Sequence, residues 1–255
     1  MISESFRDRS FTIDDPDARL RKPGALDEML TTAGGAPQRI AKGTKVKVDT
    51  VKIVPAGADA IVIFVHALDA AGAPLGWTSA NNLGGKFLSE TVGRIDPAPG
   101  AGRFGPNAAW EKGSYLGQVA LIQVVGAQRV LKQIAESTAD DFLAMVAAAR
   151  ADGVAVGMNS GFRTYGKQKE LYDGFKAKRP GFNPANPPGA SNHQNGIAFD
   201  IDVGGGGSNA TYVWLTRNAT RFGFLRTVSR EVWHWEYLPA KAAAARARGV
   251  FGTFM

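Results

Sequence analysis

Residues 191–202 read SNHQNGIAFDID, and this stretch decides how the second half of the chain is expected to fold. From residue 197 to residue 203 apolar and polar side chains alternate, which predicts a β-strand with its two aspartates on one face. The apolar face would pack in a core, so the carboxylates would be directed towards a site. His193 precedes Asp200 by seven residues, and the Asn195–Gly196 turn between them could bring the imidazole back over the end of the strand.

A second polar segment follows about thirty residues later, where residues 231–234 read EVWH. The chain has only 3 histidines, and two of them lie in these segments. His193, Asp200 and His234 together could bind a zinc ion, because two nitrogens and one oxygen leave the fourth tetrahedral position open, as in catalytic zinc sites. Glu231 could then activate a water molecule, and Asp202 is expected to orient a histidine or the loop rather than bind the metal. The pattern indicates a zinc hydrolase.

The spacing leaves the identity of the general base open. In a regular strand Glu231 and His234 would point to opposite faces, so a bend near Glu231 is needed to bring both to the metal. Glu236 would share a face with His234 and is therefore a rival for the base.

Composition limits the other possibilities. The 255 residues contain 44% apolar and 21% charged side chains, which is enough for one large or two modest packed domains. Cysteine is absent, so any metal site must use His, Asp and Glu. The net charge of +7 favours either solubility or attraction to a polyanion such as a bacterial wall. Without a lysine-rich run or a nucleic-acid motif, we expect no nucleic-acid partner.

The chain shows no standard export or membrane signal. Its first residues, MISESFRDRSFTIDDPDARLRK, lack the apolar core of a signal peptide. No stretch approaches the roughly 20 apolar residues of a membrane span. We therefore expect no stable insertion into a membrane.

Pattern changes along the chain suggest four parts. Residues 1–36 are polar and are expected to form a flexible arm, and residues 37–95 have the alternation of short strands, which predicts a small β-barrel. Residues 96–113 are rich in proline and glycine and are the expected linker. Residues 114–255 combine helical and strand patterns and are expected to form the catalytic domain.

The predicted fold class is α+β, with a small antiparallel sheet flanked by helices. Helices are expected around residues 130–134, before Gly153, through Gln168, before Gly223 and over residues 240–248. Residues 179–192 form a long loop rich in proline, glycine and asparagine, and a loop of this length is often functional.

Two resemblances to known families follow from these motifs. The pattern SxHxxGxAxD followed by ExWH is similar to the signature of the bacterial D-alanyl-D-alanine carboxypeptidase family of zinc peptidases. This family includes vancomycin-resistance D,D-carboxypeptidases, D,D-dipeptidases and phage endolysins. The segment SGFRT at residues 160–164 with Gln168 resembles another family segment, and the likeness covers roughly residues 115–240. In the first half, GWTSANNL resembles part of the bacterial Src-homology-type barrels that often bind cell walls. Wall binding and structural support both remain open for the first half.

The first resemblance implies roles for individual residues. It implies that His193, Asp200 and His234 are the zinc ligands, and that Glu231 rather than Glu236 is the general base. Arg163 would hold the substrate carbonyl oxygen or a nearby carboxylate, since a guanidinium is planar and permanently charged.

The resemblance also implies a substrate class. Ser191 and Gln168 would bind the peptide backbone or orient the loop, and the substrates would be peptidoglycan stem peptides. We expect a D,D-carboxypeptidase, partly because the segment WLTRNATRFGF and the later HWEY resemble that branch.

Alternatives remain at this stage. One is an endopeptidase that cuts L-alanyl-D-glutamate bonds or cross-links, as a lysin or a secreted effector does. Others are an enzyme acting on a free D,D-dipeptide and a wall-binding protein with a decayed site. The enzyme would act in the periplasm or cell wall, reached by lysis or specialised secretion, and an immunity or secretion partner is conceivable.

Overall fold

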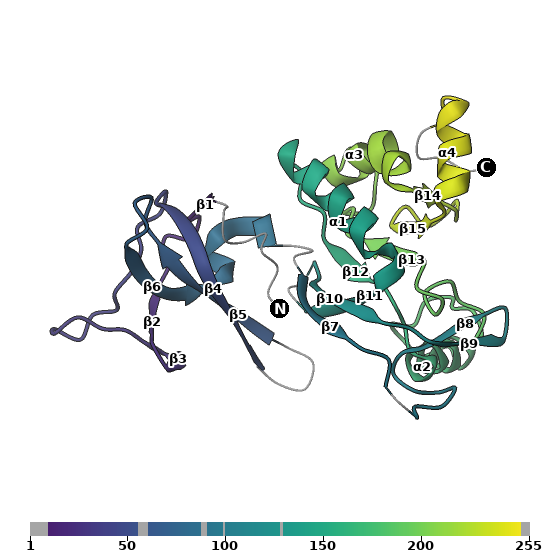
Figure 1. The fold of residues 1–255 in the computed structure, drawn as a ribbon, viewed down its shortest axis with the longest axis horizontal. Helices are drawn as coiled ribbons and strands as arrows, with labels where there is room; N and C mark the ends of the chain where they lie inside the picture. Colours follow the sequence, from purple (N-terminus) through teal and green to yellow (C-terminus); the bar gives the residue numbers. More distant parts are fainter. Residues whose placement is uncertain (1–9, 56–60, 88–90, 99, 128–129, 251–255) are drawn as a thin grey trace.

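A computed structural model describes residues 10–55, 61–87, 91–98, 100–127 and 130–250 (Figure 1). The first part of the chain forms a six-stranded antiparallel sheet with the strand order β1-β4-β5-β6-β2-β3. Its elements are β1 (Ser10–Thr12), β2 (Leu20–Lys22), β3 (Ala25–Met29), β4 (Lys45–Pro55), β5 (Ile61–Leu68), β6 (Pro74–Ser79) and the 3-10 helix η2 (Ala80–Phe87). Buried side chains of this sheet and of η2, among them Phe11, Val65 and Leu83, form a hydrophobic core.

This sheet corrects two expectations. The predicted flexible arm is wrong for residues 10–36, because β1 pairs with β4 and β2 pairs with β6. These strands leave a weak sequence pattern because they are short and β3 exposes most of its side chains. The predicted barrel is not confirmed, since β1 and β3 stand at the two ends of the strand order in the described residues.

The predicted linker is also more ordered than expected. Residues 108–118 form a hairpin of β8 (Ala108–Glu111) and β9 (Ser114–Gln118), so only part of residues 96–113 lies outside regular structure. β7 (Thr91–Ile95) and β11 (Leu131–Ala135) both pair with β10 (Leu121–Val125). The helix expected around residues 130–134 is therefore a strand.

The remaining strands carry the site. They form a four-stranded antiparallel sheet in the order β12-β13-β15-β14. The strands are β12 (Met158–Ser160), β13 (Ala198–Ile201), β14 (Phe224–Arg226) and β15 (His234–Tyr237). The helices are α1 (Glu136–Ala151), α2 (Tyr165–Lys176), α3 (Ala210–Asn218), the 3-10 helix η3 (Ala219–Phe222) and α4 (Pro239–Ala247). The predicted α+β class is confirmed.

The core lies on one face of this sheet. Phe142 of α1 is fully buried and stacks on Phe199 of β13, with ring centroids 5.0 Å apart. Phe224 of β14 meets Phe199 edge to face at 5.1 Å. The apolar residues of β13 thus point to the helices, as the alternation predicted, and Asp200 points to the opposite face. Among the described residues, no helix has the length and apolar character needed to cross a membrane.

Candidate metal centre

Strand pairing brings the polar residues of the site together. Asp200 of β13 lies opposite His234 of β15 and opposite Ser160 of β12. Residues directly opposite each other on neighbouring strands put their side chains on the same face of a sheet. The sheet therefore places residues from three separate segments of the chain beside one another.

The turn before β13 delivers His193, as the sequence predicted. Gly196 has a φ of 84°, a left-handed conformation that favours glycine, and a Cβ there would lie 2.4 Å from the Cβ of Ala135. Only glycine lets the turn pack this closely on β11. The main chain of the turn also accepts a hydrogen bond, since the Arg163 N–H donates to the His193 carbonyl at 3.0 Å.

The bend needed at Glu231 is present. β15 begins at His234, and the residues before it form turns, with the His234 N–H bonded to the Glu231 carbonyl at 3.2 Å. This turn puts the Glu231 carboxylate on the same side as the histidine ring, with 3.8 Å between Oε2 and Nδ1 of His234. The objection from regular strand geometry is thereby removed.

His193, Asp200 and His234 form a group that can hold a metal ion, with all ligand atoms within 4.8 Å of one another. Nε2 of His193 lies 3.3 Å from Oδ1 of Asp200, and Nδ1 of His234 lies 3.1 Å from the same oxygen. Ligand atoms about 2.0–2.1 Å from a tetrahedral zinc are roughly 3.3 Å apart, so these separations fit zinc.

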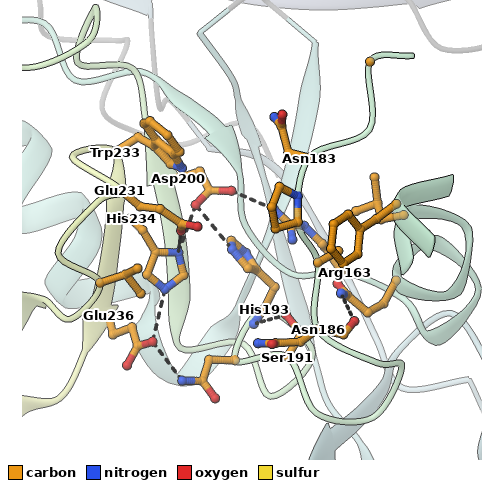
Figure 2. Close-up of a pocket in the computed structure, with 18 residues that line it drawn as sticks. Arg163, Asn183, Asn186, Ser191, His193, Asp200, Glu231, Trp233, His234 and Glu236 are labelled. Atoms are coloured by element: carbon orange, nitrogen blue, oxygen red, sulfur yellow. Dashed lines mark hydrogen bonds and ion pairs between the residues drawn. The ribbon is translucent and has the colours of Figure 1, made fainter. Parts of the chain in front are cut away.

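Each histidine is anchored through the nitrogen that faces away from the group. Nδ1 of His193 donates to the Gly161 carbonyl at 2.8 Å, and Nε2 of His234 donates to Glu236 at 3.1 Å. Glu236 in turn accepts a hydrogen bond of 2.8 Å from Asn192 (Figure 2). Such partners fix the orientation of metal-binding histidines. Sequence reasoning missed Gly161 and Asn192, because one acts through its main chain and the other carries no metal-ligand chemistry.

The charges of the group suit a cation. Burial works against ionisation of Asp200, but hydrogen bonds from His193 and His234 and the charge of Arg163 outweigh it and hold the pKa of the carboxyl below its usual range. Burial lowers the pKa of His193, which favours the neutral ring that a metal requires. For His234, burial is outweighed by the bonds to Asp200 and Glu236, which raise its pKa to about 9, so binding of a metal ion at this ring would release a proton.

Arg163 contacts the group directly. Its Nη2 donates to Oδ2 of Asp200 at 2.6 Å, and its Nε donates to Oγ of Ser160 at 2.9 Å. These bonds use two of the five guanidinium donors. Arg163 therefore holds the oxygen of Asp200 that does not face the histidines. The sequence predicted a contact of Arg163 with the substrate and not this one.

The other predicted residues differ in their placement. Gln168 is buried and donates to the Asn186 carbonyl at 2.8 Å, so it fastens the long loop to α2. Ser191 is buried, and its Oγ accepts a bond of 3.4 Å from the His193 N–H. Asp202 is exposed and accepts from the Gly204 N–H at 3.3 Å, so it supports the following turn and not a histidine.

A pocket with a volume of about 680 Å³ opens above these residues. Its wall includes Arg163, Gln168, Ser191, Glu231 and Trp233, together with residues of the long loop such as Asn183 and Asn186 (Figure 2). Trp233 is 39% exposed, which is unusual for so large an apolar side chain and makes it available to a ligand. The predicted site residues thus share one pocket.

The second part of the chain is similar to known proteins. Residues 131–240 match the family model VanY, D-alanyl-D-alanine carboxypeptidase. A D-alanyl-D-alanine carboxypeptidase of Enterococcus faecalis is 40% identical over 122 residues, covering 38% of this chain and 45% of that protein. The aligned part therefore spans less than half the length of that relative.

Two solved structures are similar to about half of this chain. VanYB in complex with D-alanine-D-alanine is 29% identical with a TM-score of 0.45, over 56% of this chain and 92% of that one. A variant of the vancomycin-resistance D,D-pentapeptidase VanY in complex with Zn(II) is 31% identical with a TM-score of 0.42, over 52% and 87%. By its own fold and side chains, the second part of the chain is an α+β domain with a His–Asp–His group that can hold a metal ion. More specifically, residues 131–240 are similar to the VanY D-alanyl-D-alanine carboxypeptidase family.

Proposed function

We propose that this chain is a zinc-dependent peptidase that hydrolyses peptidoglycan stem peptides, acting as a D,D-carboxypeptidase. The observation that carries the proposal is the juxtaposition of the His193–Asp200–His234 group with the Glu231 carboxylate in one pocket. The family match of residues 131–240 supplies the substrate class.

The donor set and its anchored histidines fit zinc, which His193, Asp200 and His234 would hold. A zinc ion at such a site supplies positive charge that polarises a carbonyl group and acidifies water. The side chain of Glu231 is 37% exposed, so it can meet a substrate. We infer that its carboxylate takes a proton from the attacking water and returns it to the leaving amine.

Glu236 is unsuited to this task. Its carboxylate is buried and bonded to His234 Nε2 and Asn192, on the side of the ring away from the ligand atom. Because of these bonds we assign Glu236 to orienting His234, and we assign Glu231 as the base.

Arg163 is the cation that faces the substrate. Of the described residues that line the pocket, it is the only arginine or lysine. We infer that its remaining donors hold either the carbonyl oxygen that gains charge or the terminal carboxylate of D-alanine. Arg226, at the end of β14, is buried and bonded to the Tyr212 hydroxyl, and it is not among the residues that line this pocket.

One observation favours the endopeptidase as a second candidate. Arg163 already pairs with Asp200, so a substrate carboxylate would have to share this cation with an existing partner. An endopeptidase buries no terminal carboxylate and would not need that cation. Digestion of peptidoglycan rich in pentapeptide stems, followed by mass spectrometry, separates the two. Released D-alanine supports the carboxypeptidase. Cleavage after L-alanine or within a cross-link, without D-alanine, would establish the endopeptidase.

The same digestion and an assay with free D-alanyl-D-alanine address the remaining alternatives. If neither gives a product, the chain is a wall-binding protein without activity, although every motif residue is present. Activity on free D-alanyl-D-alanine alone would indicate a dipeptidase. We infer that the enzyme works in the periplasm or cell wall, while the route of export and any immunity partner stay predictions.

A further inference from the structure

A group of aromatic side chains, two of them exposed, lies on the loop before β8, on the β8–β9 hairpin and at the start of α2. We call Phe104, Trp110, Tyr115 and Tyr165 the aromatic platform. Trp110 is buried at its base, and its ring centroid lies 5.8 Å from Phe104, 5.7 Å from Tyr115 and 4.8 Å from Tyr165. Phe104 is nevertheless 60% exposed and Tyr115 is 39% exposed. A group of exposed rings of this kind usually marks a binding surface.

Polar groups border these rings. The Arg103 guanidinium lies 5.2 Å from the Phe104 ring centroid and 5.0 Å from that of Trp110. The Tyr115 hydroxyl accepts a bond of 3.1 Å from Gln118, so its own proton can be donated outwards. The surface therefore combines flat apolar faces with hydrogen-bond donors at their edges.

The platform adjoins chain segments that carry residues of the catalytic pocket. The Trp110 N–H donates to the Gln194 carbonyl at 3.0 Å, and the Gly113 N–H donates to the Gly189 carbonyl at 2.8 Å. Gln194 directly follows the metal-site residue His193. Tyr165 is two residues after Arg163, so their Cα atoms are at most about 7 Å apart. The platform therefore lies beside chain segments that also carry residues of the pocket.

Two further observations locate the hairpin in the sequence and in the molecule. The family match begins at residue 131, after the hairpin has ended. β8 and β9 lie beside α2, on the side of the molecule away from the N-terminal sheet (Figure 1). The N-terminal sheet of the same molecule therefore does not cover the platform.

We propose that the aromatic platform binds the glycan strand of peptidoglycan, through the apolar faces of its N-acetylated amino sugars. The choice of this ligand rests on the proposed function, because a stem peptide held in the pocket is attached to such a strand. Aromatic rings with polar edges suit a ring that is apolar on its face and polar on its rim. Arg103 and the Tyr115 hydroxyl would bond the sugar hydroxyl and acetamido oxygens.

Binding can be tested without catalysis. Peptide-free glycan strands, prepared from peptidoglycan with an amidase, are titrated into the full chain and followed by calorimetry. Phe104→Ala and Tyr115→Ala should each weaken binding roughly tenfold, as truncation of a central aromatic contact does. Leu116→Ala is the matched control. Leu116 is 56% exposed on the same strand as Tyr115, and neighbouring side chains of a strand point to opposite faces, so binding should be unchanged.

The same titration with Glu231→Ala distinguishes failure of this proposal from failure of the proposed function. That variant should bind strands as the wild type does, although it should have lost hydrolysis of stem peptides.

Turnover adds a second readout. Phe104→Ala should raise KM for pentapeptide attached to glycan and leave kcat/KM for free pentapeptide unchanged. Absence of strand binding by the wild type, or equal loss with Leu116→Ala, would overturn the proposal. A dimer in sedimentation that Phe104→Ala abolishes, without any effect on strands, would assign the surface to a second copy of the chain and would also overturn it.

Discussion

At the scale of single residues, the site is built from side chains whose spare hydrogen-bonding atoms are held by neighbours. Asp200 presents Oδ1 to the two histidines while Arg163 holds Oδ2. Each histidine is fixed through its other ring nitrogen, by Gly161 or Glu236. This arrangement orients three donor atoms before any metal arrives, which reduces the entropy lost on binding.

Much of the site could be predicted from sequence, because histidine is rare in this chain and the aspartate lies on a clear strand pattern. The position of Glu231 could not be predicted from spacing, since it depends on a turn that ends one residue before β15. The function of Glu236 depends on its pairing with Asn192, which is 44 residues away in the chain.

Replacing a metal ligand should remove the metal and keep the fold. His193→Ala and Asp200→Ala should each lose zinc, because two remaining ligands bind the ion poorly. The fold should survive because the core is formed by other residues, such as Phe142 and Phe199. Zinc content by atomic absorption and circular dichroism spectra check both parts. Full zinc occupancy in both variants would refute the proposed ligand set.

The two glutamates should behave differently. Glu231→Ala should keep zinc and lose turnover by about 100- to 10,000-fold, the usual effect of removing a general base. Glu236→Gln should weaken zinc binding by about 10- to 100-fold, since it alters the partner of a metal-binding histidine, and turnover should return when zinc is saturating. An active Glu231→Ala beside a Glu236→Gln that stays inactive at saturating zinc would show that the base is misassigned.

At the scale of elements, short segments were harder to predict than long ones. The helix before Gly153 follows a long apolar pattern and is present as α1. The sequence predicts a helix where β11 lies, because Leu131 and Ile134 also fit a helical spacing. Its identity comes from pairing with β10, where Ile134 lies opposite Ile122. Such pairing is a tertiary interaction and leaves no local signal.

The turn before β13 offers a test of element packing. Gly196→Ala would put a methyl group 2.4 Å from the Cβ of Ala135 at a φ of 84°. Gly181→Ala is the matched control, since Gly181 has the same φ of 84° and nothing within 4 Å of the added carbon. Strain alone costs on the order of 1–3 kcal/mol of unfolding free energy, and Gly196→Ala should lose clearly more than that. Denaturant unfolding measures both variants. Equal losses would contradict the close packing of the turn on β11.

At the scale of the whole molecule, the chain joins a six-stranded sheet to the domain that carries the His–Asp–His group. The two parts are not divided where composition suggested, because β7 comes before the proline-rich stretch and yet pairs with β10. Val125 of β10 is also buried in the core of the N-terminal sheet. The polar composition of residues 1–36 predicts an arm, and the strands within residues 10–36 are only three to five residues long, too short to give a clear sequence pattern.

Removal of the N-terminal sheet should separate wall targeting from chemistry. Deletion of residues 1–90 keeps β7, and the shortened chain should still cleave small soluble peptides because all proposed catalytic residues lie later in the sequence. It should act poorly on intact wall if the sheet is an anchor. Deletion of residues 1–95 is the structural control, since β10 then loses the partner in which Ile95 lies opposite Leu121, and stability should fall. Equal activity of the 1–90 deletion on peptide and on wall would make the sheet a bystander.

The most direct test of the account is a zinc titration of the metal-free protein, followed by D-alanine release from a soluble pentapeptide. Turnover should be absent after chelation, rise in proportion to added zinc and level off at one ion per chain. Asp200→Ala should show no such rise. Undiminished turnover by the fully chelated protein, or a normal titration of Asp200→Ala, would contradict the claim that His193, Asp200 and His234 form the catalytic metal centre.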